Sequence, residues 1–119
     1  MTTTTGLFRN STDFESFPAG KLIFEEGEAG KQMFVVKDGE VDILVHGRVV
    51  ETVGAGGMFG EMALIEGGVR SARAVARTDC ALVPIDERRF TFLIQQTPQF
   101  GLQVMKIMAE RLRRIDQKL

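Results

Sequence analysis

Apolar and polar residues alternate in short stretches along the first two-thirds of the chain. The clearest example is Val41, Ile43 and Val45, which are separated by Asp42 and Leu44. A period of two places successive side chains on opposite faces of a β-strand. The pattern predicts short strands over residues 21–25, 32–37, 40–46, 48–53, 71–76 and 80–86.

Turn residues separate these stretches at short intervals. Asp38-Gly39 and His46-Gly47 each join two strand-like runs, and such glycine-containing pairs are a strong signal for a tight β-hairpin. Residues 54–57, with three glycines, break the chain again. Many short strands with frequent turns are typical of a small antiparallel β-sandwich or β-barrel, so we predict a mainly β fold.

The periodicity becomes helical in the last third of the chain. Residues 87–96 predict a short helix that Thr97-Pro98 ends, and Thr97 then caps a second helix over residues 98–119. This helix carries an apolar stripe with 3-4-3-4 spacing, formed by Met105, Met108, Leu112, Ile115 and Leu119. The stripe either packs on the barrel, covers a ligand as a lid, or forms a homodimer seam.

Composition indicates one domain over residues 1–119, with residues 1–7 expected to be disordered. Hydrophobic residues make up 44% and charged residues 26% of the chain, as is usual for globular proteins. Neither a stretch of about 18 apolar residues nor a secretory signal occurs, which predicts a cytoplasmic protein with no membrane partner. With one cysteine, Cys80, and one histidine, His46, we expect an inert core thiol, an exposed hairpin residue and no metal site. These absences argue against an enzyme such as a metal-dependent cupin.

The two halves of the chain differ in charge. Residues 1–66 hold 5 Lys/Arg and 11 Asp/Glu, a net charge of −6, whereas residues 67–119 hold 10 and 5, a net charge of +5. The basic half predicts either solvated side chains or a bound anion. Nucleic acid is a poor candidate, because the chain lacks Tyr and Trp. We expect Arg111, Arg113 and Arg114 to form a solvated helix face, with a phosphate or partner contact as the alternative.

The segment of residues 57–72 joins these halves and carries the clearest chemistry. Its glycines let the backbone approach a ligand, and residues 61–66 predict one or two helical turns whose first N–H groups can point at an anion. Glu61 and Arg70 bracket that turn, nine positions apart. A carboxylate and a guanidinium in one pocket suit a ligand with hydroxyls and a phosphate. The alternative is an ordinary surface ion pair.

This segment resembles the phosphate-binding cassette of cyclic nucleotide-binding domains. The runs Phe59-Gly60-Glu61-Met62-Ala63-Leu64 and Arg70-Ser71-Ala72 carry the resemblance. It extends over nearly the whole chain, through Phe17-Pro18-Ala19-Gly20, Gly39-Glu40-Val41, Thr78-Asp79-Cys80 and the helical run Met108-Ala109-Glu110-Arg111-Leu112. It implies a jelly-roll barrel (a double-stranded β-helix) over residues 17–86, followed by C-terminal helices over residues 87–119.

The resemblance also implies roles for single residues. Glu61 would accept a hydrogen bond from the ribose 2′-hydroxyl, and Arg70 would pair with the exocyclic oxygens of the cyclic phosphate. Backbone N–H groups around the cassette would complete the phosphate site, and Ser71 matches an Arg-Ser pair of the catabolite activator protein branch. The implied ligand-binding set is Gly60, Glu61, Met62, Ala63, Arg70, Ser71 and Ala72.

Three positions depart from that branch. Ile115 and Asp116 stand where its Thr-Ser pair contacts the base, and Val69 replaces a proline before the family arginine. Arg73 stands where cGMP-preferring members often carry Thr or Ser, which favours cAMP. Ile115, Asp116 and Arg73 are therefore the candidate base or lid contacts.

The resemblance and the residues together predict a sensor rather than an enzyme. Its ligand would be cAMP, in preference to cGMP, with no further cofactor, and binding would alter the packing of the helix over residues 98–119 and signal to a protein partner. The alternatives are an interaction or scaffold domain with a vestigial pocket, or a fragment of a larger cyclic nucleotide-regulated protein.

Overall fold

The computed structural model of the chain describes residue 8 and residues 11–117, the last three of them by their backbone alone. The disorder expected for residues 1–7 lies outside this part. Among the helices that the structure describes, none is both long and apolar enough to cross a membrane.

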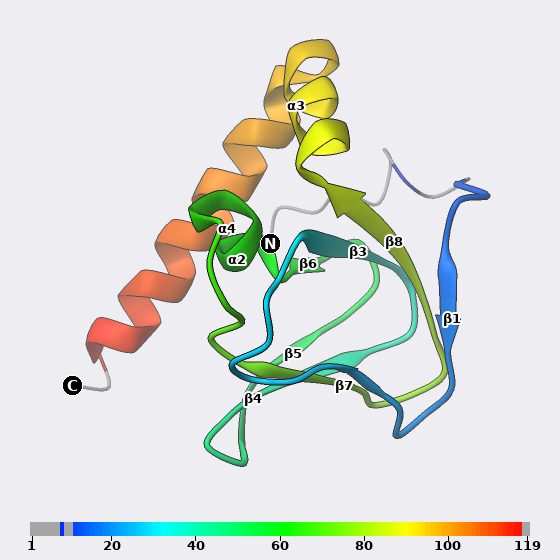
Figure 1. The fold of residues 1–119 in the computed structure, drawn as a ribbon, viewed down its shortest axis with the longest axis vertical. Coiled ribbons are helices and arrows are strands. Elements are labelled where there is room, and N and C mark those ends of the chain that lie inside the picture. Colours follow the sequence, from blue (N-terminus) through cyan, green and yellow to red (C-terminus); the bar gives the residue numbers. More distant parts are fainter. Residues whose placement is uncertain (1–7, 9–10, 118–119) are drawn as a thin grey trace.

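Two four-stranded antiparallel sheets form the body of the molecule (Figure 1). The first sheet has the order β1-β8-β3-β6 and contains β1 (Glu15–Phe17), β8 (Cys80–Asp86), β3 (Gln32–Asp38) and β6 (Met58–Phe59). The second has the order β2-β7-β4-β5 and contains β2 (Leu22–Phe24), β7 (Arg73–Ala76), β4 (Val41–Val45) and β5 (Arg48–Val53). This arrangement confirms the predicted mainly antiparallel β fold.

In the described part after residue 11, one helix interrupts the series of strands and two helices follow it. The short helix α2 (Glu61–Glu66) lies between β6 and β7, and α3 (Glu87–Gln96) follows β8 directly. The long helix α4 (Pro98–Gln117) runs back along the molecule, past α2 (Figure 1). The Asp86 side chain caps α3 by accepting a hydrogen bond from the Arg89 backbone N–H, at 2.8 Å.

The strands β3 and β8 are buried on both faces, which explains their nearly continuous apolar sequence. On β3, Met33 and Val35 belong to a core cluster shared with the helices, while Phe34 and Val36 belong to the cluster between the sheets. The strand β8 divides its side chains between the same two clusters. The core is therefore two-layered, and the first sheet separates the barrel interior from the helices.

The structure corrects the predicted apolar stripe of α4. The face that packs on the first sheet carries Phe100, Val104 and Ile107, which are all buried, and Met108 lies half-buried beside them. Met105 and Leu112 are 61% and 51% exposed, so the alternative that the whole stripe packs on the barrel is wrong. The side chains of the other two members of the stripe lie outside the described residues. A lid or a homodimer seam remains a prediction.

The hairpin histidine and the lone cysteine lie as the sequence indicates. His46 is exposed at the β4–β5 turn, with a φ of 52° in the left-handed region. Cys80 is buried, and its Sγ lies 3.1 Å from the carbonyl oxygens of both Glu40 and Thr78. Burial raises the pKa of the Cys80 thiol, which keeps it protonated and unreactive at neutral pH.

Candidate functional site

Two glycines with left-handed backbone set the limits of α2. Gly60 precedes the helix with a φ of 82°, and Gly67 ends it with a φ of 70°. Any other residue would be strained in these conformations, because its Cβ would approach the neighbouring carbonyl oxygen. The helix is therefore a six-residue segment between two sharp bends, and Glu61 is its first residue.

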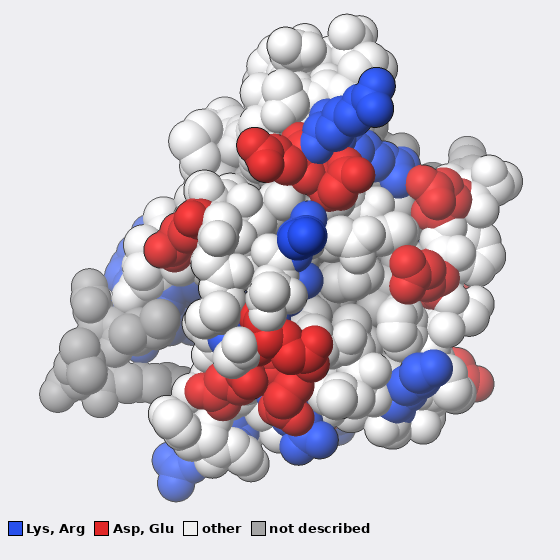
Figure 2. All heavy atoms as spheres, in the orientation of Figure 1, with Lys and Arg blue, Asp and Glu red and all other residues white. Residues whose placement is uncertain are grey.

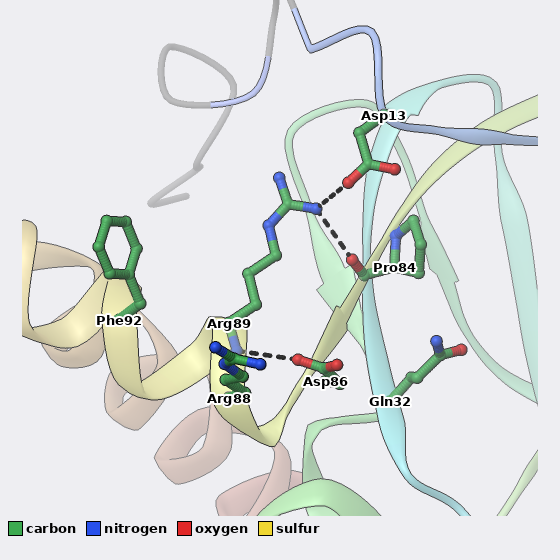
Figure 3. A pocket seen from close by; sticks show the side chains of 7 residues that line it. All are labelled: Asp13, Gln32, Pro84, Asp86, Arg88, Arg89 and Phe92. Atoms are coloured by element: carbon green, nitrogen blue, oxygen red, sulfur yellow. Dashed lines mark hydrogen bonds and ion pairs between the residues drawn. The ribbon is translucent and has the colours of Figure 1, made fainter.

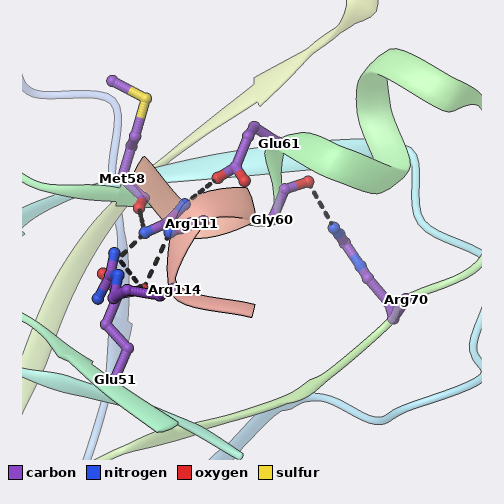
Figure 4. Close-up of polar contacts among 7 residues, drawn as sticks. All are labelled: Glu51, Met58, Gly60, Glu61, Arg70, Arg111 and Arg114. Atoms are coloured by element: carbon purple, nitrogen blue, oxygen red, sulfur yellow. Dashed lines mark hydrogen bonds and ion pairs between the residues drawn. The ribbon is translucent and has the colours of Figure 1, made fainter. Parts of the chain in front are cut away.

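Buried charges lie on either side of the start of this helix. Glu61 is 2% exposed and Arg70 is 6% exposed, and they are the buried charged residues of the described chain. The two side chains point to different partners (Figure 4). None of the ion pairs between described residues joins them, so the alternative of an ordinary surface ion pair does not hold.

Arg70 makes its hydrogen bonds with neutral backbone carbonyls. Nη1 donates to the Gly60 oxygen at 3.0 Å, and Nη2 donates to the Gln32 oxygen at 2.6 Å. The guanidinium also stacks on Phe24, with Cζ 4.0 Å from the ring centroid. A Cβ at Gly30 would lie only 2.7 Å from Arg70 Nε, so glycine is needed there to make room for the guanidinium.

Arg70 also belongs to the lining of a cavity. Burial lowers the pKa of Arg70, against the raising effect of the charges on Glu28 and Glu61, but an arginine stays charged at any physiological pH. A cavity of about 540 Å³ has Arg70 in its wall. Its lining comprises Ile23, Phe24, Glu28, Ala29, Lys31, Gln32, Phe34, Arg70 and Asp86. A buried positive charge with a polar approach of this kind suits an anionic group.

Glu61 is paired with an arginine that the sequence did not single out as a site residue. Nη1 of Arg111, on α4, donates to Glu61 Oε1 (Figure 4). The same guanidinium donates to both carboxylate oxygens of Glu51, from Nε at 2.9 Å and from Nη2 at 3.1 Å, and to the Met58 carbonyl at 2.6 Å. Arg114 lies farther out, 3.6 Å from Glu51 Oε1.

The expectation that Arg111 belongs to a solvated face is therefore wrong. Its side chain is 18% exposed, whereas Arg113 and Arg114 are exposed as predicted. Burial lowers the pKa of Arg111, but its hydrogen bonds to the carboxylates and their negative charges outweigh this and raise it. A signal in the sequence was available, because Arg111 follows Ile107 by four residues and continues the buried face of α4. No sequence signal pointed to Glu51.

The remaining cassette residues differ in how far they are exposed. Ala63 is buried, Met62 and Ala72 are half-buried, and Ser71 is exposed. Arg73 is exposed and lies 3.4 Å from Glu25 in a surface ion pair. The side chains of Ile115 and Asp116 lie outside the described residues, so the base contacts expected of them stay predictions.

A second cavity, of about 490 Å³, lies beside the start of α3 (Figure 3). Its lining comprises Asp13, Gln32, Pro84, Asp86, Arg88, Arg89 and Phe92. The charge of Arg89 is already matched, because Nη1 pairs with Asp13 and also donates to the Pro84 carbonyl. On the face shown in Figure 2, acidic and basic side chains are interspersed and the most crowded group is acidic. Within the described part of the chain, no group of three or more His, Cys, Asp or Glu side chains could hold a metal ion.

Comparison with known proteins agrees with this geometry. The model of the family "cyclic nucleotide-binding domain" matches residues 14–97. The cyclic AMP receptor protein of Thermus thermophilus is 34% identical over 108 residues, which cover 87% of this chain and 50% of that protein. The crystal structure of Thermus thermophilus catabolite activator protein superposes with a TM-score of 0.80 at 34% identity, over 91% of this chain and 54% of that one.

A further solved structure superposes on this chain over almost the whole length of both proteins. It is described under a cyclic-GMP-dependent signalling pathway that regulates bacterial phytopathogenesis. Its TM-score is 0.77 at 28% identity, with 96% of this chain and 95% of that chain covered. By contrast, the chain spans about half the length of the Thermus proteins. The family match, the jelly-roll superposition and the sequence motifs agree, and the chain belongs to the cyclic nucleotide-binding domain family.

Proposed function

We propose that the chain binds a cyclic purine nucleotide between Glu61 and Arg70, with cAMP preferred over cGMP, and that it acts as a regulatory sensor. The observation that carries this proposal is Arg70, a buried guanidinium that hydrogen-bonds, among the described residues, to uncharged carbonyls alone. A buried charge without an ionic partner is costly, and an incoming phosphate supplies that partner.

The neighbouring groups support a ligand with both a phosphate and a ribose. The planar fork of Arg70 can donate two parallel hydrogen bonds to exocyclic phosphate oxygens. The backbone of Gly60, Met62, Ala63 and Ala72 and the Ser71 hydroxyl complete the proposed phosphate site. Glu61, at the first position of α2, supplies an acceptor for the ribose 2′-hydroxyl.

The preference for cAMP rests on Arg73 and on similarity to a cyclic AMP receptor protein. A preference for cGMP is the second candidate, because the matched structure from a cyclic-GMP-dependent pathway covers 96% of this chain. Titration calorimetry with cAMP and with cGMP tests the proposal and separates these two ligands. The absence of binding to either would favour an interaction or scaffold domain with a vestigial pocket.

The ribose contact gives the first variant to test. Glu61→Gln is expected to weaken cAMP binding about tenfold, because an amide oxygen still accepts the hydroxyl but without a charge. The wild-type chain should bind cAMP more tightly than 2′-deoxy-cAMP, and the variant should show less of this preference. Glu40→Gln, which changes an exposed carboxylate, is the matched control. Equal affinity of the wild-type chain for the two ligands would show that Glu61 does not contact the ribose.

We further propose that α4 is the element that responds to the ligand. Near its C-terminal end Arg111 is hydrogen-bonded to Glu61, while Met105 and Leu112 stay exposed. Few buried contacts place such a segment at the low-stability end of the molecule. Binding that changes the Glu61 environment can then shift the packing of α4, and a protein partner or a second copy of the chain could read this change.

Hydrogen exchange with and without cAMP tests this response. Amides of residues 104–117 should change their protection on binding, while those of β3 and β8, in the centre of the first sheet, should not. Equal exchange of residues 104–117 in both states would leave the cassette as the responding element.

A further inference from the structure

We propose that Glu51, on β5, is a positioning residue that keeps one oxygen of Glu61 available to the ligand by holding Arg111 away from it. This inference rests on the proposed function, because it concerns how the same site recognises a ribose. It adds a residue from the β5 strand to a site otherwise formed by the cassette and α4.

The geometry of Arg111 carries the inference. An arginine has five N–H donors in a planar fork, and the edge formed by Nε and Nη2 is one of the two edges that can bind a carboxylate with two parallel bonds. In this structure that edge faces Glu51, at 2.9 and 3.1 Å, and Nη2 also donates to the Met58 carbonyl. Only Nη1 is left for Glu61, and it reaches the Oε1 atom (Figure 4).

Oε2, the second carboxylate oxygen of Glu61, is the atom that Glu51 keeps available to the ligand. No hydrogen bond to Oε2 of Glu61 occurs among the described residues, and Figure 4 draws the arginine contact to one oxygen alone. A ribose hydroxyl needs such an acceptor. If Arg111 turned its two-donor edge toward Glu61, it would occupy both oxygens and neutralise the carboxylate fully. Glu51 prevents this, because it holds that edge with two charge-assisted hydrogen bonds.

Burial distinguishes this contact from a surface ion pair. The side chains of Arg111 and Glu51 are 18% and 22% exposed, whereas the surface pair of Arg73 and Glu25 is 46% and 44% exposed. Solvent and salt therefore screen the Arg111–Glu51 contact less than a surface ion pair. The free-energy difference between Arg111 pairing with Glu51 and pairing more fully with Glu61 is correspondingly larger. Arg114, 3.6 Å from Glu51, adds a second positive charge on the outer side.

The test compares cAMP with 2′-deoxy-cAMP in three variants. Glu51→Gln removes the charge at nearly constant size, Glu51→Asp keeps the charge on a stem shorter by one methylene, and Glu110→Gln changes an exposed carboxylate next to Arg111. In Glu51→Gln the affinity for cAMP should fall about tenfold while that for 2′-deoxy-cAMP falls less than about threefold, since only the former needs Glu61. Glu51→Asp should recover at least half of the preference for cAMP over 2′-deoxy-cAMP that Glu51→Gln loses. Glu110→Gln should bind both ligands as the wild-type chain does. Circular dichroism checks that each variant is folded.

The ratio of the two affinities separates positioning from a merely structural role. A structural role for Glu51 would weaken both ligands equally and leave the ratio unchanged, which would overturn the inference while leaving the proposed function intact. A ratio in Glu51→Asp as low as that in Glu51→Gln would also overturn it. If the Gln variant unfolds, Glu51→Asp is compared with the wild-type chain, and equal weakening of both ligands would overturn the inference. Failure of the wild-type chain to bind either cAMP or cGMP would overturn the proposed function and this inference together.

Discussion

Replacing Arg70 by alanine is expected to weaken cyclic nucleotide binding by about 2–5 kcal/mol, or roughly 30-fold to several thousandfold. The guanidinium is 6% exposed, so a phosphate that pairs with it is largely removed from water. Without the guanidinium the phosphate would remain desolvated and unpaired, and this penalty accounts for much of the expected loss. Titration calorimetry measures the effect.

Two further variants make this experiment specific. Arg70→Lys keeps the charge but lacks the planar fork, so its affinity should also lie below that of the wild-type chain. Arg77→Ala removes an exposed arginine that lies 3.8 Å from Asp42, and it should bind normally. Affinity near that of the wild-type chain in Arg70→Ala would show that the phosphate does not bind at Arg70.

The elements predicted best from the sequence are those whose pattern is local. The limits of β8 and α3 agree with the predicted 80–86 and 87–96, because apolar runs there end at clear turn or capping residues. The strand β1 was missed because its Glu15 and Ser16 are exposed at a sheet edge and show no buried face. The strand β6 was missed because it has two residues beside a glycine-rich bend.

The face of α4 could not be chosen from periodicity alone. Met105, Met108 and Leu112 follow helical spacing, but so do Phe100, Val104 and Ile107. The barrel decides between the two stripes, because the second is buried in the core cluster on the first sheet, whereas Met108 is the one described member of the first stripe that packs against it. A helix with apolar residues on more than one side needs its partner to be known before its buried face can be assigned.

The site shows the same division between local and distant information. Glu61 and Arg70 could be found because the glycines, the short helix and the arginine all lie within residues 57–72. The contact from Arg111 to Glu61 spans 50 positions, and that from Arg111 to Glu51 spans 60. Such contacts arise when α4 folds back over the barrel. The spacing from Ile107 places Arg111 on the buried face of α4, but it does not identify Glu61 or Glu51 as its partners.

Replacing Arg111 by methionine is expected to lower the free energy of unfolding by about 3 kcal/mol. Glu61 is 2% exposed and Arg111 is its ion-pair partner, so the variant leaves a buried carboxylate without a compensating charge. Methionine keeps most of the volume and the apolar stem, which separates the loss of charge from the loss of packing. Arg113→Met, which changes an exposed arginine two residues away, should alter stability by less than about 0.5 kcal/mol. Urea denaturation of the ligand-free chain measures both variants.

A double variant distinguishes the charge effect from a general disturbance of α4. Glu61→Gln combined with Arg111→Met removes the buried charge as well as its partner, so more than half of the lost stability should return. Cyclic nucleotide affinity should not return with it, because the charged acceptor for the ribose is absent in the double variant. A double variant no more stable than Arg111→Met alone would mean that the arginine stabilises α4 through packing, and that its pairing with Glu61 contributes little to the fold.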